Sequence, residues 1–284
     1  MKTLYESILN KSGVGKMHQI QTWLDEHKVK NYKINRAGEI DVNGGVSLSR
    51  CDLTEFPSFI QFGTVKGSFY CSYNKITSLR GCPKKVEGSF DCTHNKLESL
   101  EGAPNEVGRD FACYKNNLTT LKGSPEKVGG SFDCTHNELT SLEGAPREVG
   151  EKFDCGDNSL EDLKGSPERV RGNFYCRFNL LTSLEGAPKK IGGSFYCSNN
   201  NLTTLKGAPE KIGGGFYCNN NKLTTLEGAP KKIEGNFDCE KNNLTTLKGA
   251  PNEVRGYFNC RYNNVKFSNN DVKKACSIVR SIMI

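Results

Sequence analysis

Hydrophobic and polar positions recur with a fixed period of 21 residues through most of the chain. Each period follows the pattern F-x-C-x-x-N-x-L-x-x-L-x-G-x-P-x-x-[VI]. A fixed period of this length indicates a repeat protein. The cysteine marks ten copies, which we number as turns one to ten: Cys71, Cys92, Cys113, Cys134, Cys155, Cys176, Cys197, Cys218, Cys239 and Cys260.

Each period predicts one turn of a solenoid. Phe and Cys two positions apart place both side chains on one face of a short strand, and the residue between them points to the other face. The Asn column falls where the chain turns, and its amide can satisfy backbone groups inside the coil because it both donates and accepts. The two leucines and the Val or Ile complete the interior, and Gly-x-Pro predicts a turn in the backbone. One turn is too small to hold its own core, so neighbouring turns must stack.

The segment Phe237, Cys239, Asn242, Leu244 resembles the L-x-L-x-x-N-x-L segment of leucine-rich repeats, and the following L-x-G-x-P-x-x-[VI] is similar to the short repeats of bacterial effector proteins. The resemblance covers residues 46–267 and implies a curved solenoid with a parallel sheet on its concave face and tight turns on its convex face. That family is used mainly for protein binding, although the resemblance identifies no partner. The chain departs from the family in its Phe and Cys columns and in one added residue per turn. Residues 1–9 and 56–71 also resemble repeat proteins of gut bacteria and their phages.

The ends depart from the pattern, and we expect caps there because solenoids must shield their terminal turns. The prediction has three parts: an N-terminal cap of helices and a β-hairpin over residues 1–45, a solenoid of one degenerate and ten regular turns over 46–267, and a capping helix over 268–284. The N-terminal helix is expected after an N-cap near Ser12, and the hairpin around Asn35–Gly38. The apolar positions behind these assignments are Met17, Ile20, Trp23 and Leu24 for the first helix, Val46, Leu48, Cys51, Leu53 and Phe56 for the degenerate turn, and Val272, Cys276, Val279 and Met283 for the last helix.

Thirteen cysteines and a net charge of +7 narrow the function classes. No run of about 18 apolar residues and no signal peptide is found, so we expect a cytoplasmic protein with free thiols, with delivery to a host cell or association with a virion left open. A straight column of inward thiols does not converge on a metal as zinc ligands do. We therefore interpret the column as small apolar side chains and expect no metal, no other cofactor and no catalytic residue. Cys82 and Cys276 lie outside the column and are the thiols we expect to differ.

Any specific recognition should lie in the columns that change from turn to turn. These flank the strand on its outward side: one position before Phe, one before Cys, and one and two after Cys. Turns two to five carry an acidic zone, and turns six to eight carry consecutive tyrosines; segregated aromatic residues with a neighbouring arginine are typical of protein interfaces. The candidate partner-binding residues are Asp91, Asp133, Asp154, Tyr175, Arg177, Phe178, Tyr196, Tyr217, Tyr257 and Tyr262.

A further column, nine positions after each cysteine, alternates in sign at every turn. Stacked like charges would repel, whereas alternation gives attractive neighbours, and we interpret it as control of the stacking register. The column contains Arg80, Glu101, Lys122, Glu143, Lys164, Glu185, Lys206, Glu227 and Lys248.

The sequence favours a non-enzymatic, monomeric scaffold that binds a protein partner through the concave face, with the acidic zone selecting a basic patch. Its alternative is a structural or surface component of a phage or bacterial assembly. Nucleic-acid binding is a weaker alternative, based on the basic pairs Lys84-Lys85, Lys189-Lys190 and Lys231-Lys232. No membrane partner is expected.

Overall fold

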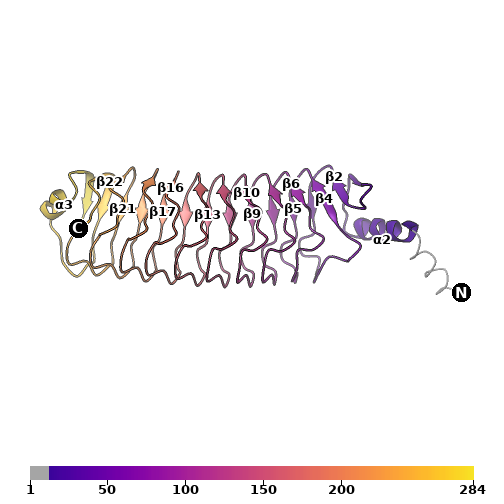
Figure 1. Cartoon of the computed structure of the whole chain (residues 1–284), viewed down its shortest axis with the longest axis horizontal. Helices are drawn as coiled ribbons and strands as arrows, with labels where there is room; N and C mark the ends of the chain where they lie inside the picture. Colours follow the sequence, from indigo (N-terminus) through magenta and orange to yellow (C-terminus); the bar gives the residue numbers. More distant parts are fainter. Residues whose placement is uncertain (1–12) are drawn as a thin grey trace.

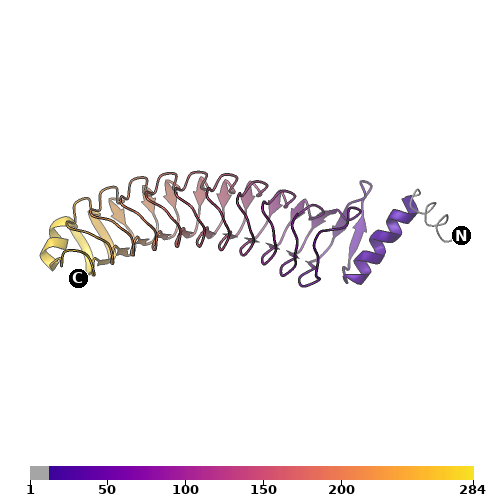
Figure 2. The ribbon, with the colours of Figure 1, turned by 90° about the horizontal axis from the view of Figure 1, so that it is seen from below.

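Each 21-residue period forms one turn of a parallel-sheet solenoid of about 12 turns, as the sequence predicts (Figure 1). The computed structural model describes residues 13–284. Ser12, the expected N-cap, and residues 1–9 lie outside these residues. The long axis is bent into a shallow arc (Figure 2).

The phenylalanine column forms one strand per turn, and each pairs in parallel with its neighbour so that Phe lies beside Phe. The buried rings follow one another with centroids 5.0–5.9 Å apart from Phe69 to Phe258. The strands of this first ladder are β3 (Val46–Ser47), β5 (Phe69–Tyr70), β7 (Phe90–Asp91), β9 (Phe111–Ala112), β11 (Phe132–Asp133), β13 (Phe153–Asp154), β15 (Phe174–Tyr175), β17 (Phe195–Tyr196), β19 (Phe216–Tyr217) and β21 (Phe237–Asp238).

A second ladder of short parallel strands follows the Val or Ile column, where the sequence predicted only a return to the interior. It forms because the extended backbone around each of these buried residues also bonds to the neighbouring turn, as where the Gly129 N–H donates to the Val107 carbonyl at 3.0 Å. One strand, β22 (Glu253–Asn259), runs through both ladders. The others are β4 (Phe62–Val65), β6 (Lys85–Val86), β8 (Glu106–Val107), β10 (Lys127–Val128), β12 (Glu148–Val149), β14 (Arg169–Val170), β16 (Lys190–Ile191), β18 (Lys211–Ile212) and β20 (Lys232–Ile233).

The asparagine column ties each turn to the one before it. The amide of Asn242 donates to the carbonyl of Cys239 in its own turn and to that of Cys218 in the preceding turn, both at 3.1 Å. Its side-chain oxygen accepts from the N–H of Leu223 in the preceding turn at 3.0 Å. The same set of bonds recurs at other members of the column, such as Asn95 and Asn179. The prediction that this column satisfies the turning backbone is confirmed.

Two columns hold left-handed backbone. The glycine before each proline has φ between 83° and 94°, and a Cβ at Gly123 would lie 2.4 Å from the carbonyl carbon of Leu100. The second position after each cysteine has φ between 51° and 56° in every regular turn, but no glycine occupies it. Residues other than Gly, Asn and Asp are disfavoured in this region.

The N-terminal cap consists of helix α2 (Gly13–Glu26) and an antiparallel hairpin of β1 (Tyr32–Ile34) and β2 (Ile40–Val42), which begins the second ladder. The expected hairpin is confirmed. Trp23 of the helix packs against Phe56 and Phe62 of the degenerate turn, with ring centroids 6.5 Å apart in both contacts. Ile20 and Leu24 are buried as expected, whereas Met17 is exposed.

The C-terminal cap corrects the expected helix over 268–284. Helix α3 covers only Asn269–Ala275 and is followed by a strand, β23 (Ile278–Met283), parallel to β22. The helix begins at a capping box in which Ser268 and Asp271 bond to each other's backbone N–H. Residues 278–283 form a strand because the edge of β22 offers unpaired backbone groups for hydrogen bonds. The N–H of Cys260, next to β22, donates to the Met283 carbonyl at 3.0 Å. The division into three parts stays a prediction.

Twelve of the thirteen cysteines are buried, and all thirteen are free. Thiols of the column donate to a strand carbonyl of the next turn, as from Cys134 to Asp154 at 3.3 Å and from Cys176 to Tyr196 at 3.4 Å. Burial raises the pKa of these thiols well above the usual value. Cys82 and Cys276 are buried too, and the thiol that differs is Cys51. It lies at the position of an asparagine in the degenerate turn, where its N–H donates to Asn74.

In the alternating charge column, three pairs of neighbouring turns form the ion pairs expected if the column controls the register. These are Glu101–Lys122, Glu185–Lys206 and Glu227–Lys248, at 2.8–3.0 Å. Lys164 instead contacts Asp162 of its own turn at 2.8 Å. These side chains are well exposed, so salt screens the attraction.

Replacing Asn242 by Ala should lower the free energy of unfolding by about 3 kcal/mol, because two buried carbonyls and one N–H lose their partner. The neighbouring Asn243 is the matched control, since it is exposed and its side chain carries none of these bonds. Urea denaturation followed by circular dichroism measures both variants. Equal effects of Asn242→Ala and Asn243→Ala would contradict the role given to the column.

A thiol reagent added to the folded protein should modify one cysteine rapidly and twelve slowly. Cys51→Ser should abolish the rapid phase, while Cys82→Ser and Cys276→Ser leave it unchanged, because burial protects those two thiols. Absorbance of the released thiol chromophore follows the reaction. A rapid phase that survives in Cys51→Ser would show that another cysteine is accessible.

Candidate protein-binding face

The outward side chains of the first ladder and of the turn that follows it form one continuous surface, which we call the strand face. It comprises the four variable columns identified in the sequence. In the structure these columns divide into those whose side chains bond to the solenoid's own backbone and those whose side chains are free to meet a partner.

The column three positions before each cysteine is largely structural. Its short polar side chains accept the backbone N–H of the same position in the next turn, as Asp110 does from Ser131 at 2.8 Å and Asn173 from Ser194 at 2.7 Å. The sequence did not reveal this role, because Ser, Asn and Asp at a variable position read as ordinary surface residues. Tyr257 belongs to this column and is half-buried, in turn ten. Burial raises the pKa of its hydroxyl.

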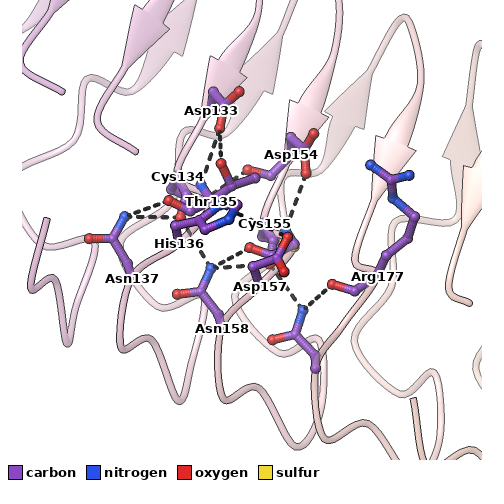
Figure 3. A network of polar contacts seen from close by, with 12 residues as sticks. Asp133, Cys134, Thr135, His136, Asn137, Asp154, Cys155, Asp157, Asn158 and Arg177 are labelled. Carbon is purple, nitrogen blue, oxygen red and sulfur yellow. Dashed lines mark hydrogen bonds and ion pairs between the residues drawn. The ribbon is translucent and has the colours of Figure 1, made fainter. Parts of the chain in front are cut away.

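The aspartates directly before the cysteines also bond to their own turn. One carboxylate oxygen of Asp91 accepts from the Thr93 N–H at 2.9 Å, and Asp133 and Asp154 make the equivalent bond (Figure 3). Lys152 lies between the other oxygens of Asp133 and Asp154, at 3.1 and 3.4 Å.

These bonds hold the carboxylates of the acidic zone against the backbone of the solenoid. Asp154 is only 7% exposed, and burial raises the pKa of its carboxyl although Lys152 opposes the shift. Partial burial in turn opposes, but does not cancel, the rise that Asp133 and Asp154 cause in the pKa of Lys152. From the sequence these carboxylates are expected to be free charges, whereas the turn geometry brings each of them to a backbone N–H.

The three consecutive tyrosines form a ladder. The ring centroids of Tyr175 and Tyr196 are 4.4 Å apart and those of Tyr196 and Tyr217 are 4.5 Å apart, with planes inclined by 8° and 2°. The hydroxyls at the two ends accept from Asn173 at 3.0 Å and Asn236 at 3.3 Å. The ladder is therefore a stack of three nearly parallel, partly exposed rings that is held by hydrogen bonds at both ends.

A glycine makes room for the last ring of the ladder. Turn eight carries Gly215 where other turns carry a larger residue, and a Cβ there would lie 2.7 Å from the Tyr217 ring. Burial raises the pKa of the Tyr217 hydroxyl.

Exposed apolar side chains stand beside the ladder in turn six. Phe178 is 51% exposed and lies in the left-handed column, and Leu180 is 47% exposed two positions later. The guanidinium of Arg177 lies over the Tyr175 ring, 5.1 Å from its centroid, and its buried Nε has no hydrogen-bond partner. The sequence identified Phe178 and Arg177 but not Leu180, which is the one apolar residue four positions after a regular-turn cysteine.

A second aromatic group lies at the N-terminal end of the same face. Tyr73 stacks on His94 with centroids 4.0 Å apart, Arg50 lies over Tyr73 at 4.6 Å, and Tyr114 meets His94 edge-on at 5.4 Å. Burial and the nearby Lys115 lower the pKa of His94. This group was not predicted from the sequence, although the second position after each cysteine shows Tyr73 and His94 in consecutive turns.

The last candidates lie apart from the ladder. Tyr262 in turn ten is 69% exposed, and Arg261 lies over its ring at 5.8 Å while also pairing with Glu240 at 3.2 Å. Asp238 of turn nine separates Tyr262 from the three stacked tyrosines. Among residues 13–284, no three His, Cys, Asp or Glu side chains are grouped to hold a metal ion. Over the same residues, no helix has the length and apolar character needed to cross a membrane.

No protein-family model matches the chain, and no curated protein matches it. Solved structures of YopM are among those similar to this chain. YopM from Yersinia enterocolitica WA-314 has a TM-score of 0.43 and 18% identity over 77% of this chain and 56% of that one. YopM from Yersinia pestis, described as a leucine-rich effector protein, has a TM-score of 0.53 and 19% identity over 78% of this chain and 67% of that one. The chain thus spans little more than half of the first structure, and with the second it shares the architecture of a leucine-rich-repeat-like parallel solenoid.

Proposed function

We propose that this chain is a non-enzymatic scaffold that binds a protein partner through the strand face, with turns six to eight at the centre of the interface. The observation that carries the proposal is the tyrosine ladder with its exposed apolar neighbours. Rigid aromatic side chains lose little conformational freedom on binding, and Tyr and Arg are enriched among residues that dominate binding energy.

The backbone of turn six supports the same assignment. Phe178 occupies a left-handed position, which a bulky residue adopts at a cost of about 1–2 kcal/mol. Turns seven and eight place Asn199 and Asn220 there, and Asn tolerates this conformation well. Tyr73 and Tyr262 share this backbone conformation, but Phe178 lies in a turn of the ladder. Because 51% of Phe178 is exposed, the solenoid buries little of its ring, and a partner on the ladder would cover it.

The acidic zone contributes less to this proposal than the sequence argument assigned to it. Asp91, Asp133 and Asp154 each devote a carboxylate oxygen to their own turn, and Lys152 neutralises part of the remaining charge. A basic patch on the partner is therefore a secondary expectation.

Phe178→Lys should reduce partner recovery about tenfold or more in affinity capture from a lysate of the encoding organism, as expected for loss of a central hydrophobic contact. Lysine occupies the same position in turns three and nine, so the fold should tolerate it. The matched control is Tyr73→Lys, the same change at the same position of turn one.

Tyr196→Ala combined with Tyr217→Ala removes the ladder and provides a second measurement. Quantitative mass spectrometry of the captured proteins compares all three proteins with the wild type. If both the Phe178 variant and the ladder variant retain every partner at wild-type yield, the proposal is wrong.

A further inference from the structure

A second charge column, fourteen positions after each cysteine, alternates in sign only in the first half of the solenoid. Lys85, Glu106, Lys127 and Glu148 alternate, and ion pairs join the first two at 2.8 Å and the last two at 3.4 Å. The next four turns carry cations in succession, and the sign returns to negative only at Glu253. These four cations are Arg169, Lys190, Lys211 and Lys232.

This run of like charge opposes the stacking of the turns. Lys190 and Lys211 are direct partners in the β16–β18 pair, and neighbouring strands lie about 4.8 Å apart. Like charges directly opposite each other destabilise a sheet. The alternating columns of the same chain show that its turns can carry opposite charges at equivalent positions, so the run is not forced by the repeat.

The cations around this run are also free of ion pairs. Within residues 13–284, no ion pair involves the exposed side chains of Arg169, Arg171, Lys189, Lys190, Lys211 and Lys231. Glu168 pairs with Arg147, and Glu234 pairs with Lys232 and Arg255, which leaves Glu210 as the nearby carboxylate. A hollow at the C-terminal end of the run is lined by proline rings, three lysines and two glutamates: Pro209, Pro230, Lys211, Lys231, Lys232, Glu210 and Glu234.

The run lies in the same turns as the tyrosine ladder. Arg169, Lys190 and Lys211 each precede one ladder tyrosine by six residues. The connection between them is short and carries small side chains in two of the three turns, Gly192–Ser194 and Gly213–Gly215. We expect a partner that covers the ladder to reach these cations, because only five residues separate each cation from its tyrosine.

We propose that the cationic run is a docking site for an acidic segment of the protein partner that binds the ladder. This inference rests on the proposed function, because it assigns a charge to the same partner. Charge complementarity supports this proposal. Six exposed cations without ion pairs lie within a few turns, and an acidic segment would supply the carboxylates that pair with them. Electrostatic attraction of this kind steers association and selects among partners.

The surroundings favour an acidic polypeptide over a nucleic acid. The ladder rings stack on one another, so their faces are not free to stack on bases, which is the usual aromatic contact with single strands. Asp154 and Asp238 flank the ladder, and Glu148 and Glu253 bound the cationic run, so phosphates extending beyond these few turns would meet carboxylates.

Fluorescence anisotropy with a labelled peptide of twelve glutamates tests the inference at low salt. The wild type should bind this peptide, and Lys190→Glu should weaken binding about tenfold or more, whereas Lys222→Glu should weaken it at most about twofold. Lys222 is the matched control because it is exposed and lies in another column. Lys190→Arg should retain wild-type affinity.

The same variants exclude unfolding as the cause. Lys190→Glu restores alternation between Arg169 and Lys211, so its melting temperature at low salt should equal or exceed that of the wild type. Equal losses of peptide affinity in Lys190→Glu and Lys222→Glu would overturn the inference, as would tighter binding of a twelve-nucleotide thymidine strand than of the glutamate peptide with the same dependence on Lys190.

The outcomes separate this inference from the proposed function. If the Phe178 variant and the ladder variant both retain every partner while glutamate binding still depends on Lys190, the proposed function fails, and so does the assignment of the acidic segment to its partner. If partner capture depends on the ladder but peptide binding is indifferent to Lys190, the inference fails alone.

Discussion

The structure depends on one constraint: no turn can satisfy its own backbone or bury its own core. The asparagine column meets the first need by joining carbonyls of two successive turns with one amide, while its oxygen accepts from the turn before. The stacked phenylalanines meet the second need, since each ring is covered by the rings of its neighbours. Every other column is restricted by this stacking, because a side chain at a given position always lies beside its counterpart in the next turn.

This restriction separates structural variation from functional variation. Ser, Asn and Asp replace one another three positions before the cysteine because each can accept an N–H from the next turn. Aspartate before the cysteine caps its own turn, so its recurrence needs no partner. The solenoid does not explain the tyrosine ladder, which lacks that cap, or the exposed Phe178 in the same turns. These residues are where the argument for binding is strongest.

Much of the fold follows from the sequence because the period exposes it directly. The Phe, Cys and Leu columns, the asparagine role and the hairpin at Asn35–Gly38 could all be predicted from spacing and residue chemistry. The last strand could not, because Val272 to Met283 has helical spacing, while the free edge of β22 decides the outcome. The site was harder to predict than the fold. The tyrosines were visible in one column, but the bonds of Asp133 and the exposure of Leu180 depend on how the turn folds.

The two charge columns show how stability and recognition compete on such a surface. Where sign alternates, as at Glu185 and Lys206, neighbouring turns attract, and the arrangement is explained by the solenoid alone. Where sign repeats, as at Lys190 and Lys211, the same geometry makes neighbours repel. A repeat that keeps alternation in one column and loses it in another, in the turns that carry the tyrosine ladder, gives up some stability at that place. Natural proteins give up stability most often where function requires it, and this makes the broken column a guide to the binding surface that is independent of the tyrosines.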